Sequence, residues 1–170
     1  MVETTQHFIT VESANRPDPA NTTPANYTVQ LPQRYRNIWS AMLVNIALPA
    51  VSPPQKYVYL DIDKLNTIDS TSPSGGVNFS LAKIPLSLAS ASNVYYLDTS
   101  INSFPSIPLQ NPVATMDKLN IKLKDANGNV LTIPAGNEHS FMLQFMCGDY
   151  VPNGGGSTIT QRGRYMGGTR

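Results

Sequence analysis

The stretch NYTVQLPQRYRNIWSAMLVNIALP, Asn26–Pro49, holds two apolar runs of different kinds. In residues 27–31 apolar and polar side chains alternate, which is typical of a strand with one solvated face. Residues 38–48 are apolar on both sides, with only Ser40 and Asn45 interrupting. A strand buried on both faces and a buried helix both produce such a run, because periodicity alone cannot separate them at this length. The surrounding sequence therefore decides between them.

The surrounding segments favour strands. Short runs follow one another at intervals of about ten to fifteen residues, each bounded by Pro, Gly or Asn, which is the spacing of an all-β sandwich or barrel. Because the neighbouring segments are strand-like, residues 38–48 are predicted to form a long central strand covered on both faces. About eight strands are expected, at residues 6–12, 27–31, 38–48, 56–62, 77–84, 94–97, 118–124 with a return at 130–133, and 141–147.

The composition is poor in charge. Only 14% of the 170 residues are charged, the formal net charge is +1, and 14 residues are proline. Ordinary soluble domains carry roughly a quarter charged residues, so this surface must be built largely from Asn, Ser, Thr and Gln. Such a surface favours a chain that packs against neighbours. We expect one domain over residues 1–150, followed by a distinct arm at 151–170.

No feature of the sequence indicates secretion or a membrane span. The N-terminus carries acid where a signal peptide carries base, and no apolar stretch approaches the ~20 residues of a membrane-spanning helix. The single cysteine, Cys147, lies in an aromatic strand pattern, so we expect a small core residue rather than a nucleophile. A chain without disulfides suits a reducing compartment. The N-x-[ST] sequons at Asn21, Asn26 and Asn78 are expected to stay unmodified.

The segment DANGNV, at residues 125–130, combines a turn signal with oxygen ligands. Asn127-Gly128 tolerates positive φ and predicts a hairpin turn. Acidic and amide residues alternate as in a calcium loop, but Val130 and Gly136 stand where such a loop needs Gly and Glu. Residues 61–69 fail for similar reasons. No metal site is predicted at either place.

Residues for catalysis or cofactor binding are too few to form a site. The two histidines, His7 and His139, are far apart in sequence, and a metal site on a β-sandwich needs more ligands. No G-x-S-x-G motif provides a nucleophile, so His139 is expected to be a loop histidine before a strand. Residues 154–156 are glycines, but they lack the Lys-Ser or Lys-Thr of a phosphate loop. No catalytic residue, cofactor, metal or small-molecule substrate is predicted.

The arm at residues 151–170 is rich in glycine and carries three arginines and no acid. We expect it to be flexible in isolation and to order on a partner. Three charges would neutralise only about three phosphates, and physiological salt disrupts such weak binding, which disfavours nucleic acid. Arg and Tyr are favoured anchors in protein interfaces. The predicted partner contacts are Arg162, Arg164, Tyr165 and Arg170.

Several motifs, taken in order, resemble one known family. They are Ser-x-Asn-Arg (Ser13, Asn15, Arg16), Asn-Tyr-x-Val-x-Leu-Pro (26–32), Arg-Asn-Ile-x-Ser (36–40), Leu-Val followed by a proline (Leu43, Val44, Pro49), Asp-Lys-Leu-x-Ile-x-Leu-x-Asp-x-x-Gly (117–128) and His-Ser-Phe-x-Leu (139–143). Over residues 9–147 their order and spacing resemble the single jelly-roll penton and minor capsid proteins of nucleocytoplasmic large DNA viruses, in particular those of chlorella virus type.

The resemblance implies an all-β fold, an eight-stranded single jelly-roll sandwich of two facing four-stranded sheets with flexible terminal arms. It implies a structural capsid protein of the virion, assembled in the host cytoplasm, with no enzymatic activity. The compact length resembles pentons most, which implies homopentamers at the five-fold vertices of an icosahedral capsid. Their partners would be neighbouring capsid proteins, including the major capsid protein, and the arms at residues 1–5 and 151–170 are candidates for tying neighbours together.

Two other functions remain open at this point. A related jelly roll could serve as a minor capsid protein beneath the major capsid lattice. A lectin-like jelly roll could bind glycans through exposed aromatic side chains, for which Tyr95 and Tyr96 are the candidates. A pentamer in solution would favour the penton, whereas glycan binding by the isolated domain would favour the lectin.

Overall fold

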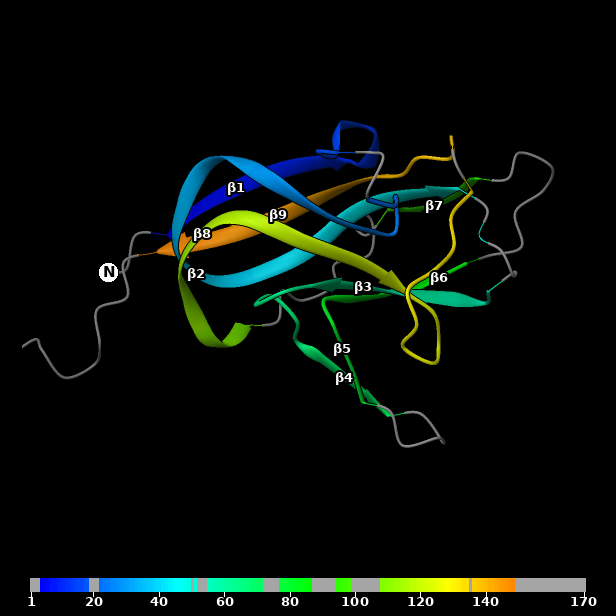
Figure 1. The fold of residues 1–170 in the computed structure, drawn as a ribbon. Helices are drawn as coiled ribbons and strands as arrows, with labels where there is room; N and C mark the ends of the chain where they lie inside the picture. The colour runs from blue at the N-terminus through cyan, green and yellow to red at the C-terminus, as the bar shows by residue number, and fades with distance from the viewer. Residues whose placement is uncertain are drawn as a thin grey trace, which may run out of the picture.

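The chain forms one strongly curled antiparallel sheet and a separate two-stranded ribbon (Figure 1). The computed structural model describes residues 4–18, 22–49, 51, 55–71, 77–86, 94–98, 108–134 and 136–148. These ranges hold nine strands and one 3-10 turn, and no α-helix. The elements are β1 (Thr4–Glu12), η1 (Ser13–Asn15), β2 (Asn26–Pro49), β3 (Tyr57–Ile62), β4 (Ile68–Thr71), β5 (Val77–Ser80), β6 (Ala82–Pro85), β7 (Val94–Asp98), β8 (Pro108–Lys124) and β9 (Ser140–Gly148).

The first layer of the curled sheet contains β1, β9, the second half of β2, and β7. β1 pairs with β9 over its whole length, from Thr4 opposite Gly148 to Glu12 opposite Ser140. On its other side β9 pairs with β2. β7 pairs with the last residues of β2, from Asn45 onward. β1 is therefore a free edge of this layer.

The second layer contains the first half of β2, β8, β3 and β6. Tyr27 of β2 lies opposite Ile121 of β8, and Leu60 of β3 lies opposite Leu123 on the other side of β8. β6 pairs with β3 and ends the layer. Because β2 belongs to both layers and curls between them, the layers face each other as in a single jelly roll (Figure 1). The predicted all-β jelly-roll class is confirmed, whereas the strands of the described residues number nine rather than the expected eight.

β2 is one continuous strand of 24 residues where two strands were predicted. The run at residues 38–48 is a strand, as expected, and not a helix. The pairing of β2 with β8 shifts register between Gln30 and Tyr35 and again between Ile38 and Ser40. Asn37, between the two shifts, has a positive φ of 50°. These irregularities bend the strand without ending it, since bulges bend a strand and increase its twist.

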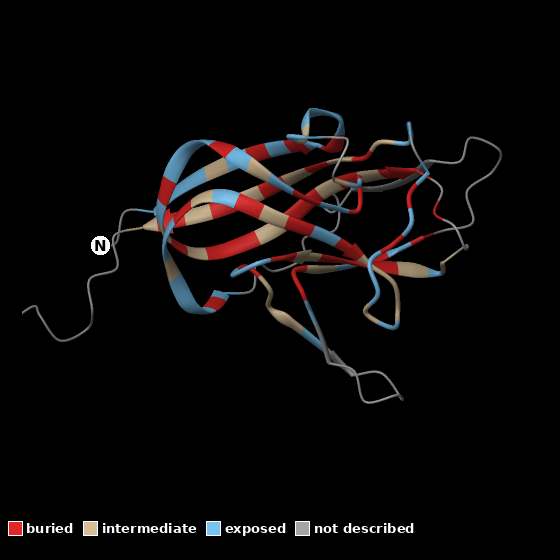
Figure 2. Ribbon diagram, in the orientation of Figure 1, coloured by how far each residue is buried: buried red, intermediate tan, exposed pale blue. Residues whose placement is uncertain are grey.

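The hydrophobic core lies between the two layers. Buried side chains alternate with half-buried or exposed ones along β9 and the second half of β8, as the banding in Figure 2 shows. Burying each large apolar side chain contributes roughly 1.5–3 kcal/mol. Cys147 is buried at the end of β9 and free, which confirms the prediction of a core residue. The largest fully buried side chains include Phe141, Phe145, Ile38, Leu60, Leu119 and Ile121.

Three local features differ from the prediction. Residues 77–84 are not one strand, because the chain changes partner at Leu81: β5 before it pairs with β4, and β6 after it pairs with β3. β4 was not predicted at all. β8 begins at Pro108, ten residues before the expected start at Lys118. The predicted return at 130–133 is confirmed in part, because Val130 forms an antiparallel bridge with Lys124 and the amide of Leu131 donates to the carbonyl of Leu123 at 2.9 Å, although no regular strand forms there.

The predicted turn at Asn127-Gly128 is confirmed. Gly128 has a φ of +86°, a conformation that costs glycine little. One carboxylate oxygen of Asp125 accepts hydrogen bonds from the backbone amides of Asn127 at 2.8 Å and Asn129 at 2.9 Å. The acidic and amide side chains therefore close the turn itself.

Candidate assembly surfaces

The outer surface of the first layer is almost free of charge. Paired residues of neighbouring strands share a face, and Gln144 lies opposite Phe8 of β1 and Met42 of β2. Phe8 is 57% exposed. The only charged side chain on the described part of this surface is Glu12, at its margin. We call the set Gln6, Phe8, Thr10, Met42, Met142, Gln144 and Met146 the methionine face.

The outer surface of the second layer is lysine-rich instead. Lys118 and Lys122 are exposed on β8, and Lys124 of the same strand forms an ion pair with Asp61 of β3. The ammonium group of Lys83 on β6 lies 4.1 Å from the centre of the Tyr57 ring, which is within cation–π range. In their described parts the two outer faces of the jelly roll therefore differ in chemistry: one is thioether-rich and carries charge only at its margin, and the other is polar and basic.

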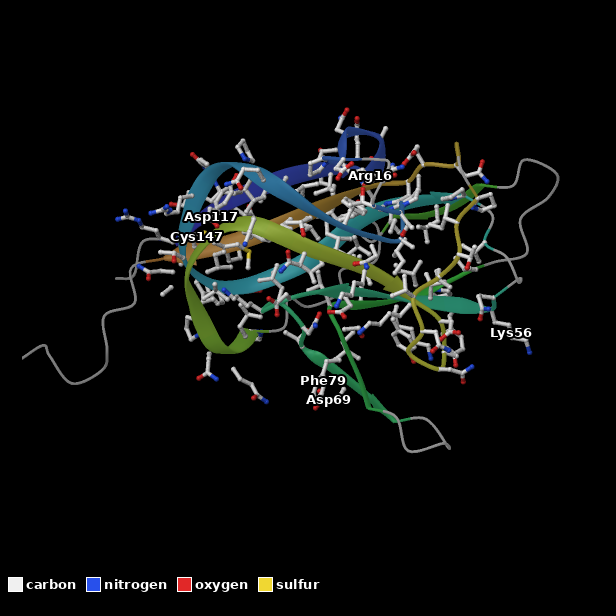
Figure 3. The ribbon with its side chains drawn as sticks, viewed as in Figure 1. Arg16, Lys56, Asp69, Phe79, Asp117 and Cys147 are labelled. Atoms are coloured by element: carbon white, nitrogen blue, oxygen red, sulfur yellow. The ribbon has the colours of Figure 1, made fainter. Side chains whose placement is uncertain are left out.

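A hollow of about 430 Å³ opens at the end of the jelly roll where β1 begins and β9 ends. His7 and Tyr35 pack edge to face in it, with ring centroids 5.1 Å apart. Arg34 lies 3.7 Å from Asp117 in an exposed ion pair, and Figure 3 labels Asp117 and Cys147 at this end of the molecule. We call the lining residues His7, Gln33, Arg34, Tyr35, Arg36 and Asn37 the arginine mouth.

The β4–β5 ribbon projects from the second layer (Figure 1). In the described residues it forms a sheet of its own with two strands. Asp69 lies opposite Phe79, so both side chains emerge on one face of the ribbon. Phe79 is 55% exposed and Asp69 is exposed (Figure 3). A hollow of about 350 Å³ separates this face from the start of β8.

A buried polar cluster closes the opposite end of the β1–β9 pair. The guanidinium group of Arg16 donates to both carboxylate oxygens of Glu138 at 2.8 Å and to the carbonyl of Ser13. The Ser13 hydroxyl donates to Glu138 and accepts the backbone N–H of His139. The Ser13 amide in turn donates to the carbonyl of His139 at 2.9 Å. These bonds fix the η1 turn to the loop that precedes β9.

His139 lies in this loop directly before β9, as predicted, and is buried there. Its Nε2 lies 2.7 Å from the carbonyl oxygen of Pro24 and 3.3 Å from the Tyr27 hydroxyl. Because a carbonyl oxygen only accepts, Nε2 carries the hydrogen and Nδ1 is the unprotonated nitrogen. Within the described structure Nδ1 is buried without a hydrogen-bond partner. The ring stacks on Phe141 at 5.8 Å.

The environment of the cluster shifts three pKa values. Burial lowers the pKa of His139 and raises that of Tyr27, so both stay neutral at pH 7. Burial alone would raise the pKa of Glu138, but the hydrogen bonds from Arg16 and Ser13 and the charge of Arg16 lower it overall. The cluster is thus a fixed arrangement of one ion pair and neutral groups. It holds chain segments together, and the Ser13 hydroxyl that donates to Glu138 is itself fully buried.

Several predicted site residues lie outside what the structure describes. Arg162, Arg164, Tyr165 and Arg170, with the whole arm at 151–170, are outside the described residues, as are residues 1–3 and Asn21. The backbone of Tyr95 and Tyr96 is described in β7, but not their side chains. Asn26 is exposed at the start of β2.

Among the described residues, no three His, Cys, Asp or Glu side chains gather as metal ligands. In the described part of the chain, no helix has the length and apolar character needed to span a lipid bilayer.

A comparison with known proteins assigns the family. The chain is 84% identical over all 170 residues to penton capsid protein P1 of Paramecium bursaria Chlorella virus 1, and the match covers 100% of both chains. The chain belongs to the penton capsid proteins. No family model matches the sequence.

As a penton capsid protein the chain has a structural role in the virion, and the resemblance drawn from its motifs is confirmed. Residues of the first and the last motif lie in contact. Ser13 and Arg16 of the first motif bond with Glu138 and His139 at the last one. The sequence pointed to both motifs but not to their contact. The exposure of Phe79 was not predicted either, because residues 77–84 were interpreted as one strand of the sandwich.

Proposed function

We propose that five copies of this chain close a ring at each five-fold vertex of an icosahedral capsid. The observation that carries the proposal is the 84% identity, over the full length, to a protein named as a penton. A homopentamer needs no catalysis and no cofactor, because its work is to complete the shell. Assembly would take place in the host cytoplasm, where the unpaired thiol of Cys147 stays reduced.

The surfaces of the jelly roll suit a ring. A closed ring of five requires a heterologous contact, in which one surface of each copy meets a different surface of the next. The methionine face, the lysine-rich face, the arginine mouth and the ribbon are four unlike surfaces on one small domain. A stable contact should bury about 1,000 Å² or more. Each contact can be modest, since a subunit in a shell is held on several sides at once.

The terminal arms are proposed to tie the ring to its surroundings. In this division residues 1–150 form the jelly-roll domain and residues 151–170 the arm. Thr4 and Gly148 lie opposite each other at one end of the first layer, so the segments before β1 and after β9 are attached to the domain at adjacent points. Arg162, Arg164, Tyr165 and Arg170 would then contact neighbouring subunits, including the major capsid protein.

Native mass spectrometry of the purified chain tests the ring. We expect a species of five times the 18.5 kDa chain mass, which dissociates into monomers on dilution. A chain that stays monomeric at every concentration, with its secondary structure intact, would contradict the homopentamer. That result would favour a place beneath the major capsid lattice, where the chain is held by other proteins.

A further inference from the structure

Two charged groups lie exposed on different sides of the molecule with no ion-pair partner in the described structure. Asp69 stands on the β4–β5 ribbon, next to the exposed Phe79. Arg36 is exposed at the rim of the arginine mouth, whereas its neighbour Arg34 already faces Asp117. The ribbon therefore presents an acid with an aromatic ring, and the mouth presents a base with aromatic rings.

Only the base of the ribbon packs on its own domain: Ser80 is fully buried there, whereas Asp69 and Phe79 are exposed. In the described part of the chain β4 pairs only with β5 and β5 only with β4. An isolated two-stranded hairpin is marginally stable in water. Exposing a phenylalanine on such an element has a cost that a partner surface would remove. A projecting, marginally stable ribbon with an exposed ring has the features of a contact arm.

The mouth has the chemistry to receive this arm. Its volume of about 430 Å³ is large enough for a phenylalanine side chain. The half-buried ring of His7 supplies aromatic surface, and the buried Tyr35 ring beneath it packs on His7 and, at 5.5 Å, on Phe145, which holds the lining in place. Rings prefer edge-to-face neighbours of this kind. Arg36 supplies the charge that complements Asp69.

We propose that the face of the β4–β5 ribbon that bears Asp69 and Phe79 packs on the arginine mouth of the next subunit, with Phe79 against His7 and Asp69 against Arg36. This inference rests on the proposed pentamer and names the contact that closes it. The contact is heterologous, because ribbon and mouth are different surfaces of the same chain, and so it can generate a ring. Its ionic part guides the choice of partner and its aromatic part supplies the anchor.

Charge reversal tests the pairing directly. Asp69→Arg and Arg36→Asp should each weaken assembly at least about tenfold, because each places like charges together in every contact of the ring. The double variant, with both charges reversed in the same chain, should assemble within about threefold of the unmodified protein. Lys56→Asp is the matched control: it also reverses a charge, at an exposed position before β3 that lines neither the mouth nor the hollows beside the ribbon, and assembly should not change.

The aromatic part is tested separately. Phe79→Ser should weaken assembly about tenfold or more, whereas Val130→Ser, at a site that is also exposed and apolar, should leave it unchanged. Circular dichroism and the melting temperature of dilute monomer should stay the same for all these exposed positions. Native mass spectrometry gives the fraction of pentamer for each variant.

The outcomes separate this contact from the proposed function. If the unmodified chain is a pentamer and the double reversal restores assembly, the contact is supported. If the unmodified chain is a pentamer but the single reversals have no effect, or the double reversal does not restore assembly, the contact is overturned while the pentamer stands. An unmodified chain that never assembles overturns both.

Discussion

Nη1 of Arg16 lies 2.8 Å from Oε2 of Glu138, although 122 residues of sequence separate them. The pair lies beside the end of the first layer where Glu12 pairs with Ser140. The other end of the same strand pair, where Thr4 lies opposite Gly148, bears the arginine mouth. The two ends of this strand pair therefore differ: internal polar contacts fix one, and a hollow with exposed arginines marks the other.

Arg16→Ala should lower the free energy of unfolding by about 2 kcal/mol. The side chain of Arg16 is 9% exposed and that of Glu138 is 31% exposed, so the loss is smaller than for a fully buried pair but larger than for a surface pair. Urea unfolding of the monomer measures it. Arg34→Ala is the control, because its pair with Asp117 is 62% and 50% exposed and should change stability by less than about 0.5 kcal/mol. Equal losses for both variants would contradict this account of the cluster.

Acid should destabilise the protein, and His139 should account for part of the loss. Its pKa is lowered in the folded state, so the unfolded chain binds more protons below about pH 6.5 and stability falls as pH falls through that range. The pKa of Glu138 is also lowered, which adds a loss at more acidic pH, once its carboxylate is protonated in the folded state. Both pKa values are lowered in the folded state, so both groups make the folded protein less stable in acid.

His139→Gln separates the two contributions, because glutamine keeps a hydrogen-bond donor for the carbonyl of Pro24 but does not titrate. Melting temperatures between pH 7.5 and 5, a range chosen to span the usual histidine pKa, should fall less steeply for this variant than for the unmodified chain. The control is Thr10→Gln, at an exposed position of β1, which removes no titratable group and should leave the slope unchanged. Parallel slopes for all three proteins would refute the role assigned to His139.

The bend of β2 depends on a residue that tolerates positive φ. Asn37→Val should lower stability by about 1–2 kcal/mol, since a β-branched residue is strained at a φ of 50°. Asn37→Gly should be neutral or slightly stabilising. Gln30→Val, at an exposed position of the same strand before the bend, should change stability by less than about 0.5 kcal/mol. Denaturant unfolding of the three variants decides the matter, and a tolerated Asn37→Val would show that the bend does not depend on this backbone conformation.

Strand patterns in the sequence predicted most of the sandwich and missed the parts that depend on distant contacts. The alternating apolar residues of β9 and of the second half of β8 report burial directly, so their positions were confirmed. β4 has the sequence IDST, with one apolar residue in four, and no periodicity could reveal it. The early part of β8 contains Pro108 and Pro112, and prolines argue against a strand. It nevertheless pairs with β2 beyond the bend, where Ser40 lies opposite Pro108.

The candidate surfaces were harder to predict than the fold. The pairing of Arg16 with Glu138 joins residues from opposite ends of the domain, and local patterns carry no information about such contacts. The exposure of Phe79 follows from the change of strand partner at Leu81, which is a property of the whole sheet. The methionine face, by contrast, was visible in principle, because Met142 and Met146 alternate with core residues along β9.

Deleting residues 151–170 should leave the jelly roll folded and weaken assembly. β9 ends at Gly148 and its last pairs, such as Thr4 with Gly148, are formed by residues that the deletion spares. The melting temperature of the truncated monomer should therefore match that of the full chain, while virions or pentamers that contain it should dissociate at lower temperature or lower salt. A variant that keeps the arm but replaces Arg162, Arg164 and Arg170 with alanine should reproduce part of the loss, if charge is what the arm contributes. Particles of unchanged stability after truncation would refute the arm as a clamp, and a truncated chain that fails to fold would refute the boundary placed after residue 150.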